Sequence, residues 1–313
     1  MPDRLTVTKT YKLFINGQFP RSESGRSLIV HGRDGSVLAH TCHASRKDLR
    51  DAVVAARGGF DGWSRRSAYN RGQILYRLAE MLEGKRTEFV EAIDSTAPAS
   101  PDVPAKKKQG AKKSASSAPK AARLDPEREV SAAIDRLVAY AGWADKFSQV
   151  LGCNNSVNGP YYNFTIAEPT GVVAVVAPDE LPLLGLVSLI APAACAGATV
   201  VALASEASPL AACIFGEVCA TSDVPAGVIN LLTGKRDELV PHIANHRDID
   251  AIHAANLPAV AAAALRTGAA ENVKRVTTRT LTPAEWLDAD TCESPWWIER
   301  MVDMKTIWHP ASA

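Results

Sequence analysis

Between residues 171 and 255 the chain alternates short apolar runs with longer helix-like segments, and this alternation restricts the fold more than any other feature. The runs GVVAVVAP at 171–178 and ATVVALA at 198–204 have apolar side chains on both faces of an extended chain. Such runs are typical of strands that are covered on both sides. Two further runs, at 227–234 and 249–255, follow with helical segments between them. Strands and helices that alternate in this way form βαβ units. The sequence therefore predicts an α/β fold, with a Rossmann-like parallel sheet and helices on both faces.

The region before residue 171 predicts hairpins and amphipathic helices. Asn16-Gly17 is a hairpin-turn pair between short β-prone runs, and Ser45 is a good N-cap for a helix with apolar residues at helical spacing. Asp125 and Pro126 are typical of a helix start. We therefore expect, in chain order, a hairpin at 13–19, a helix after Ser45, a helix over about 70–93, a helix over about 125–147 and a hairpin over about 154–167.

A strongly basic segment divides the chain. Residues 97–123 contain six lysines and one arginine against one acid, a charge of +6 in a chain whose net charge is +1. The segment has no aromatic residue and no Leu, Ile, Met or Phe, so it buries too little apolar surface to offset the entropy lost on folding. The sequence predicts a disordered basic linker here, between a unit at 1–96 and a second unit at 124–279, with a tail at 280–313. A solubilising tether and a binding site for an acidic partner are both open interpretations.

The composition is typical of soluble globular proteins, with 46% hydrophobic and 22% charged residues. No apolar run reaches the ~18 residues of a membrane helix without turn residues, and the polar start lacks the apolar region of a secretory signal. The six cysteines include no Cys-x-x-Cys pair, which argues against a zinc ribbon or a disulfide framework. We expect a reduced, cytoplasmic chain that does not bind membranes.

Several stretches, in the right order, resemble the aldehyde dehydrogenase superfamily. LFINGQF at 13–19 is similar to the first hairpin of the family, and YAGWADKFSQVLG at 140–152 is similar to the helix after its N-terminal helix pair. EPTGVVAVVAP at 168–178 and VPAGVINLLTG at 224–234 resemble the first half of the coenzyme domain. The resemblance implies a nucleotide-binding α/β domain, a family activity of NAD(P)-dependent aldehyde oxidation, and NAD or NADP as the cofactor.

The chain departs from the family pattern at the cofactor motifs. Glu180 stands where the family has the Asn that donates to an oxyanion, and an ionised carboxylate cannot donate and repels such a charge. Leu203 replaces a Lys of the next motif, whereas Glu206 keeps the carboxylate that contacts the adenine ribose in the family. Gly234 keeps the first glycine of the family's T-G-x-G. The resemblance leaves Glu206 and Gly234 as residual cofactor-binding positions, and we expect no tightly bound cofactor.

The catalytic motifs are changed as well. Arg279 lies where the family has the Glu that serves as general base, and an arginine stays protonated near neutral pH. Cys292 is the only thiol in the region where the nucleophile is expected, but its neighbours Thr291 and Glu293 do not match that motif. A nearby acid raises the pKa of a thiol instead of lowering it. Since family chains are also longer, we expect a truncated, degenerate member that lacks the catalytic domain and has no catalytic residue.

Two segments resemble the strands with which the family pairs its subunits, namely the hairpin at about 154–167 and MKTIW at 304–308. The resemblance implies an oligomerisation arm formed by Tyr161, Tyr162, Phe164, Ile166, Thr306, Ile307 and Trp308. An exposed edge strand can pair with a strand of another chain. We therefore expect a non-catalytic subunit, a pseudoenzyme, that assembles as a homo-oligomer or as a hetero-oligomer with a full-length aldehyde dehydrogenase.

Two other functions stay open. One is a divergent NAD(P)-dependent aldehyde oxidoreductase that completes its site from another chain. The other is a scaffold whose basic linker holds an acidic partner. Nucleic acid is disfavoured as that partner, because no aromatic residues lie between the lysines to stack on bases.

A few histidines and tryptophans have more than one interpretation. His242 and His246 have the i, i+4 spacing of a metal site and His253 follows, but no further ligand has matching spacing. We therefore expect no metal site. Trp296 and Trp297 suit either an interface or a tail that folds back on its own core.

Overall fold

The computed structural model describes residues 7–96 and 124–311. The predicted basic linker at 97–123 lies outside the described residues.

A five-stranded parallel sheet forms the centre of the molecule, in the strand order β10-β9-β6-β7-β8. Its strands are β6 (Val172–Val176), β7 (Thr199–Leu203), β8 (Ile229–Leu232), β9 (Ala251–Ala255) and β10 (Arg275–Arg279). Every residue of β6 to β9 is buried, as expected for strands covered on both faces. The predicted α/β fold with a parallel sheet is confirmed.

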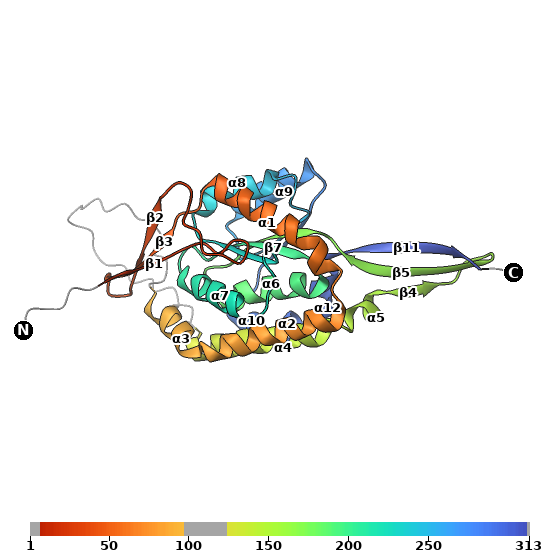
Figure 1. The fold of residues 1–313 in the computed structure, drawn as a ribbon, viewed down its shortest axis with the longest axis horizontal. Helices are drawn as coiled ribbons and strands as arrows, with labels where there is room; N and C mark the ends of the chain where they lie inside the picture. The colour runs from red at the N-terminus through yellow and green to blue at the C-terminus, as the bar shows by residue number, and fades with distance from the viewer. Residues whose placement is uncertain (1–6, 97–123, 312–313) are drawn as a thin grey trace, which may run out of the picture.

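Helices cover both faces of this sheet. Figure 1 shows α1, α8 and α9 on one side and α2, α4, α6 and α7 on the other. Alternate residues of β6 belong to different core clusters. Val172, Ala174 and Val176 cluster with buried residues of α1, α8 and α9, whereas Val173 and Val175 cluster with buried residues of α2, α4, α6 and α7. The helices are α1 (Arg46–Ser64), α2 (Ala68–Gly84), α3 (Arg86–Ser95), α4 (Pro126–Trp143), α5 (Phe147–Leu151), α6 (Leu184–Ala196), α7 (Leu210–Thr221), α8 (Arg236–Asn245) and α9 (Ala259–Ala270).

Two helix predictions were too long. The expected helix over 70–93 is divided at Lys85, which follows Gly84 and whose N–H donates to the carbonyl of Leu82, 3.0 Å away. Glycine is a poor helix former, and the tighter bond closes the last turn. The expected helix over 125–147 ends at Trp143. After it, the N–H of Ala144 donates to Ala141 O and the N–H of Lys146 donates to Trp143 O, which are bonds to the third preceding residue, as at Lys85.

The predicted local signals at the N-terminal end are confirmed. Asn16 and Gly17 adopt φ values of 54° and 72°, which the tight hairpin turn requires. Ser45 accepts from the N–H groups of Lys47 and Asp48, and the Asp48 carboxylate accepts from the Ser45 N–H. Close by, β1 (Lys9–Tyr11), β2 (Ser27–His31) and β3 (Val37–Cys42) form a small sheet in the order β1-β3-β2.

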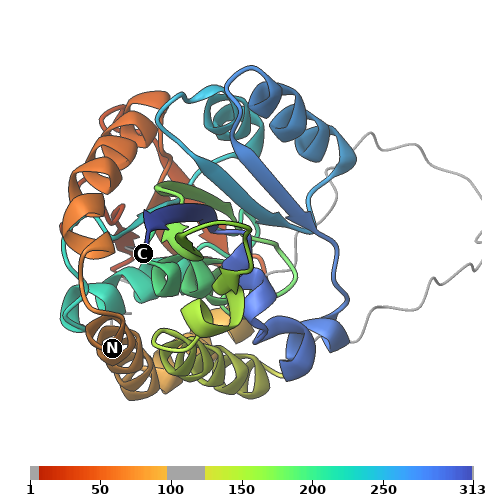
Figure 2. The ribbon, with the colours of Figure 1, turned by 90° about the vertical axis from the view of Figure 1, so that its right-hand side faces the viewer.

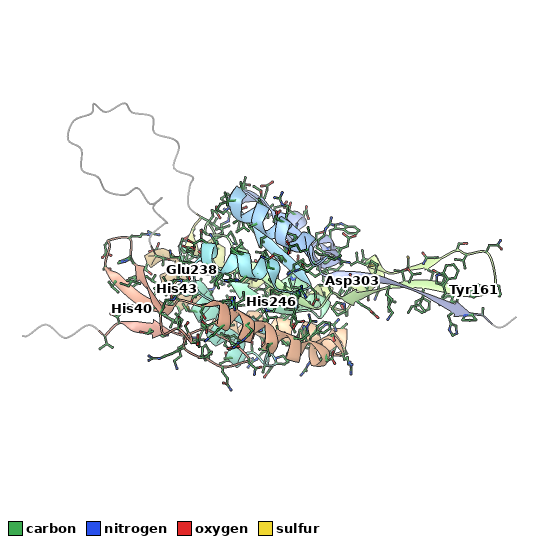
Figure 3. All side chains as sticks on the ribbon, turned by 90° about the horizontal axis from the view of Figure 1, so that it is seen from above. His40, His43, Tyr161, Glu238, His246 and Asp303 are labelled. Atoms are coloured by element: carbon green, nitrogen blue, oxygen red, sulfur yellow. The ribbon has the colours of Figure 1, made fainter. Side chains whose placement is uncertain are left out.

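A three-stranded arm projects from one end of the body (Figure 1), and Figure 2 shows the molecule from the side of this arm. It consists of β4 (Cys153–Asn155), β5 (Tyr161–Pro169) and β11 (Val302–Pro310), antiparallel, in the order β11-β5-β4. The hairpin and the C-terminal strand expected from the sequence are both present, and the structure pairs them within one chain. Figure 3 shows Asp303 at the base of this arm and Tyr161 near its tip.

The segment between β10 and β11 folds back onto the body as three short helices. These are α10 (Pro283–Leu287), α11 (Ala289–Cys292) and α12 (Pro295–Glu299). Trp286 and Trp297 belong to the same core cluster as α4 and α6, whereas Trp296 is 57% exposed. Of the two interpretations of the tryptophan pair, packing on the chain's own core therefore holds for Trp297. In the part of the chain that the structure describes, no helix has the length and apolarity needed to cross a membrane.

Candidate functional site

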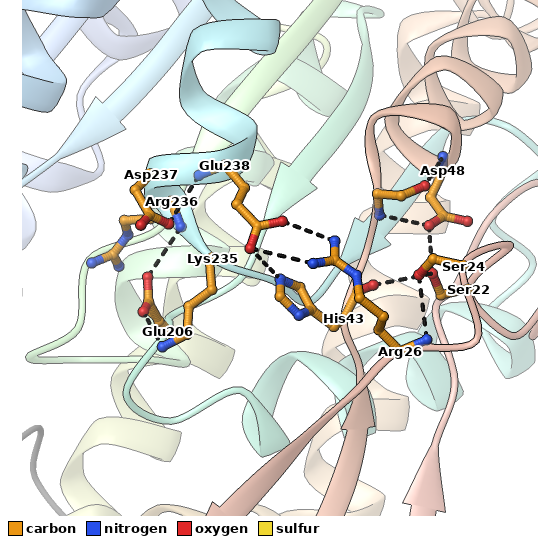
Figure 4. Close-up of polar contacts among 11 residues, drawn as sticks. Ser22, Ser24, Arg26, His43, Asp48, Glu206, Lys235, Arg236, Asp237 and Glu238 are labelled. Carbon is orange, nitrogen blue, oxygen red and sulfur yellow. Dashed lines mark hydrogen bonds and ion pairs between the residues drawn. The ribbon is translucent and has the colours of Figure 1, made fainter.

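The carboxyl ends of the central strands are the place where parallel α/β sheets bind ligands. Four charged side chains meet there, each just beyond the end of β6, β7 or β8: Asp179, Glu206, Lys235 and Arg236. Figure 4 shows Glu206 with Lys235 and Arg236, beside the first turn of α8. The edge of the sheet that the resemblance assigns to the cofactor is therefore strongly charged.

Asp179 is the centre of this network. Its carboxylate accepts from Ser205 Oγ at 2.8 Å and from the N–H groups of Glu206 and Ala207 at 2.9 and 3.1 Å. Both terminal nitrogens of Arg236 donate to it as well. Burial alone raises the pKa of Asp179, but the bonds from Arg236, Ala207 and Ser205 hold it below its ordinary value. Asp179 is therefore ionised, and both of its carboxylate oxygens accept hydrogen bonds from groups of the chain.

Glu206 is also held within the chain. Lys235 Nζ lies 2.5 Å from its carboxylate, and the N–H of Arg236 donates to the other carboxylate oxygen at 3.0 Å. The guanidinium of Arg236 also donates to the carbonyl of Ala177 at 2.6 Å. The residual ribose-binding role of Glu206 stays a prediction, since both of its oxygens are bonded to residues just beyond β8. Gly234 is buried beside Leu239 and Ala44.

Glu180 lies apart from this network and is exposed. Its nearest polar contact is a long one, 3.4 Å from Asn256 Nδ2. The amide of Asn256 is engaged with the backbone of Leu281, donating to its carbonyl and accepting from its N–H, both at 2.9 Å. Asn256 therefore fastens β9 to the segment that follows β10.

Arg279 is enclosed by the folded-back tail. Its guanidinium lies 3.6 Å from the ring centroid of Trp297, and its Nε donates to His253 Nε2 at 2.9 Å. Burial lowers the pKa of Arg279 to about 10, so it stays protonated at neutral pH and cannot accept a proton. Burial likewise lowers the pKa of His253 to about 3, which leaves a neutral ring whose Nδ1–H donates to Leu189 O at 3.1 Å. This arrangement is a packing contact in the core.

The histidines do not form a metal site with one another. His246 Nδ1 accepts from the N–H of Asp248, and His242 lies beside it on α8, whereas His253 is enclosed in the core. Among residues 7–96 and 124–311, no three His, Cys, Asp or Glu side chains gather in the manner of metal ligands.

None of the six cysteines has the setting of an activated thiol. Five are buried, and the exposed one, Cys153, lies on β4 of the arm. The Cys292 Sγ–H donates to Glu285 O at 3.2 Å, and burial raises the pKa of this thiol. Burial also raises the pKa of Cys195, Cys213 and Cys219.

Helix α4 fastens the tail through a buried arginine, which the sequence reasoning missed. Arg136 donates to Ser188 Oγ and to Trp286 O, both at 2.9 Å, and lies 3.4 Å from the Glu293 carboxylate. One helical turn later, the hydroxyl of Tyr140 donates to Cys292 O at 2.8 Å. The four polar contacts join α4 to segments of the chain that are far away in sequence.

The same helix carries a buried carboxylate. Glu129 is 2% exposed, and one of its oxygens accepts from the N–H groups of Leu183 and Leu184 at the start of α6. Burial raises the pKa of Glu129 to about 7, although the two N–H bonds oppose the shift.

Known proteins of one family match this chain. The aldehyde dehydrogenase family profile matches residues 20–101 and 103–280. The cytosolic 10-formyltetrahydrofolate dehydrogenase of Xenopus laevis is 29% identical over 280 residues, which are 88% of this chain and 28% of that protein. Retinal dehydrogenase 2 of Gallus gallus is 33% identical over 275 residues, which are 86% of this chain and 48% of that protein.

Solved structures give the same result. The NAD+ complex of the aldehyde dehydrogenase from Bacillus cereus matches with a TM-score of 0.73 and 26% identity, over 87% of this chain and 51% of that chain. The chain thus spans about half, or less, of the length of these relatives. The fold, the order of the matched segments and the match to the family profile agree, and the chain belongs to the aldehyde dehydrogenase family.

Proposed function

We propose that this chain is a non-catalytic member of its family, which assembles with itself or with a full-length aldehyde dehydrogenase as a structural or regulatory subunit of the cytoplasm. The observation that carries the proposal is the network of Asp179, Glu206, Lys235 and Arg236, which occupies the ligand-binding edge of the sheet with contacts inside the chain.

The residues at this edge do not fit a dinucleotide. A ribose that approached Glu206 would have to displace both Lys235 Nζ and the N–H of Arg236 from the carboxylate. Breaking one partner from a part-buried, charge-assisted contact costs free energy that a new hydroxyl contact only partly returns. The cations here are also neutralised by Asp179 and Glu206, so they do not form a free phosphate site.

The residues at the catalytic positions that the resemblance assigns also do not suit aldehyde oxidation through a thioester. Such a reaction needs a thiolate and a group that accepts a proton. Cys292 is buried with a raised pKa, and Arg279 is a cation enclosed against Trp297. All six cysteines are free thiols, which agrees with a reducing compartment.

The arm supports the assembly part of the proposal. Large apolar side chains are exposed together on it: Tyr161, Tyr162, Ile166, Met304 and Trp308 are between 37% and 58% exposed. Clusters of exposed apolar residues mark interaction sites, and the unpaired backbone groups of an edge strand can form hydrogen bonds with a strand of another chain.

Titration with the cofactors tests the proposal directly. We expect calorimetry to show no saturable heat with NAD or NADP up to about 1 mM, where binding would be worth about 4 kcal/mol. The protein should form no NADH with short aldehydes, and an active aldehyde dehydrogenase in the same buffer is the control. Saturable cofactor binding together with aldehyde-dependent NADH formation by the isolated chain contradicts the proposal.

A further inference from the structure

On β11, the backbone N–H and C=O groups of alternate residues point toward β5, and those of the residues between them point outward. The carbonyl of Met301 accepts from the Thr170 N–H, and the N–H of Ala311 donates to Pro160 O. In an antiparallel ladder, alternate residues direct their backbone groups to the same side. The backbone N–H and C=O groups of the odd-numbered residues from 301 to 311 therefore point toward β5. Those of Met304, Thr306 and Trp308 point away from the arm.

We infer that β11 pairs with the β11 of a second copy of this chain, antiparallel, with Thr306 on the two-fold axis. The two arms then form one six-stranded sheet. A two-fold contact uses the same surface on both copies, so Met304 lies opposite Trp308 of the partner subunit. This inference rests on the proposed assembly role and names the partner and the register.

The backbone groups at the two ends of β11 fit this register. Pro310 has no N–H to donate, and it lies opposite Val302 of the partner subunit. The carbonyl of Val302 needs no such donor, because the guanidinium of Arg275 already donates to it. Met304, Thr306 and Trp308 each exchange both bonds with their opposite residue. Every outward backbone group of β11 is then satisfied.

Registers shifted by two residues fit less well. In one, Pro310 lies opposite Met304, whose carbonyl is left without a donor. In the other, the Trp308 N–H lies opposite Val302 of the partner subunit, whose carbonyl already accepts from Arg275. This register also places Lys305 opposite Lys305 of the partner subunit. Like charges that are directly opposite destabilise a sheet.

The side chains agree with the two-fold register. Met304 is 45% exposed and Trp308 is 58% exposed, on the same face of the arm. Pairing places the sulfur of one copy against the indole of the other, twice, and such contacts are favourable. On the opposite face, Asp303 lies opposite His309 of the partner subunit, and no like charges meet.

The other edge of the arm is less suitable. The strand β4 has only three residues, whereas β11 has nine without a register shift. Natural edge strands are protected from pairing by bulges, charged side chains or proline. In β11 the only proline is the terminal Pro310, and the charges of Asp303 and Lys305 are paired within the chain, with Arg275 and Glu168. Of the two edges of the arm, β11 is therefore the one that can pair with another strand.

Disulfide trapping tests the register. In a Cys153→Ser background, Thr306→Cys should give a covalent dimer on mild oxidation, because opposite bonded residues have Cα atoms about 5.5 Å apart. Met304→Cys is the matched control, since its two copies would lie about 14 Å apart. Mixing Met304→Cys with Trp308→Cys should form a crosslink that neither variant forms alone. We expect at least tenfold more dimer from Thr306→Cys than from Met304→Cys, and equal yields overturn the register.

A proline variant tests the pairing itself. Thr306→Pro removes an outward N–H and the hydroxyl contact with Thr165 Oγ1, but it leaves every backbone bond between β11 and β5 in place. The monomer should therefore fold with unchanged circular dichroism. Sedimentation between about 1 and 100 μM should show dimers for the wild type and at least tenfold weaker association for Thr306→Pro. A wild-type monomer that still co-purifies with a full-length aldehyde dehydrogenase overturns self-pairing but supports the proposed function. A monomer that binds no such enzyme overturns both.

Discussion

Replacing Arg136 by methionine should lower the free energy of unfolding by about 3–5 kcal/mol, the usual cost of removing one member of a buried polar network. The guanidinium is 1% exposed and joins α4 to Ser188, Trp286 and Glu293. Methionine fills the space but donates no bond, so a hydroxyl and a carbonyl are left buried without partners. Urea unfolding, followed by tryptophan fluorescence and circular dichroism, gives the difference in free energy.

Arg128→Met is the matched control, because Arg128 is an exposed arginine on the same helix. It should change the free energy of unfolding by less than about 0.5 kcal/mol. If Arg136→Met is as stable as this control, the tail is not fastened through α4. A loss of tail packing without global unfolding would appear as earlier quenching of tryptophan fluorescence than of the helical signal.

Replacing Glu129 by glutamine should stabilise the protein above neutral pH by up to about 3 kcal/mol. The pKa of Glu129 is raised by burial from 4.5 to about 7. Between these two values the folded chain binds a proton that the unfolded chain releases, so the wild type loses stability as the pH rises. The bonds to Leu183 and Leu184 use one carboxylate oxygen, which the glutamine carbonyl can replace.

The measurement is the free energy of unfolding at pH 4 and pH 8. Glu129→Gln and the wild type should agree at pH 4, where both side chains are neutral, and should separate at pH 8. Glu127→Gln, an exposed acid two residues earlier on the same helix, is the control and should show no such separation. A constant difference between Glu129→Gln and the wild type at both pH values contradicts the raised pKa.

Most of the fold could be predicted because its signals are local or strongly periodic. The β6 and β7 runs are apolar on both faces, and this pattern has few other solutions in a soluble chain. The Asn16-Gly17 turn and the Ser45 cap were predictable because they depend on a few neighbouring residues. The break at Lys85 was not predicted, since the apolar spacing continues across it.

The site was less predictable, because it depends on pairing between strand ends. Arg236 is recognisable in sequence because it replaces the second glycine of the T-G-x-G motif. The contacts of Lys235 and Arg236 with Glu206 and Asp179 follow instead from the side-by-side order of β6, β7 and β8. The position of Asp179 just after a buried strand was the available signal. Arg136 gave none, because its partners lie 52 to 157 residues away in sequence.

The pairing of β5 with β11 also sets the order in which the protein can form. The two strands are joined by contacts such as Lys305 with Glu168, 137 residues apart in sequence. During synthesis β5 has only the short β4 beside it, and a two-stranded hairpin of this kind is marginally stable in water. Long-range strand pairing of this kind is slow to form. The arm can therefore become rigid only after 302–310 has been synthesised, so assembly through it selects chains that have completed folding.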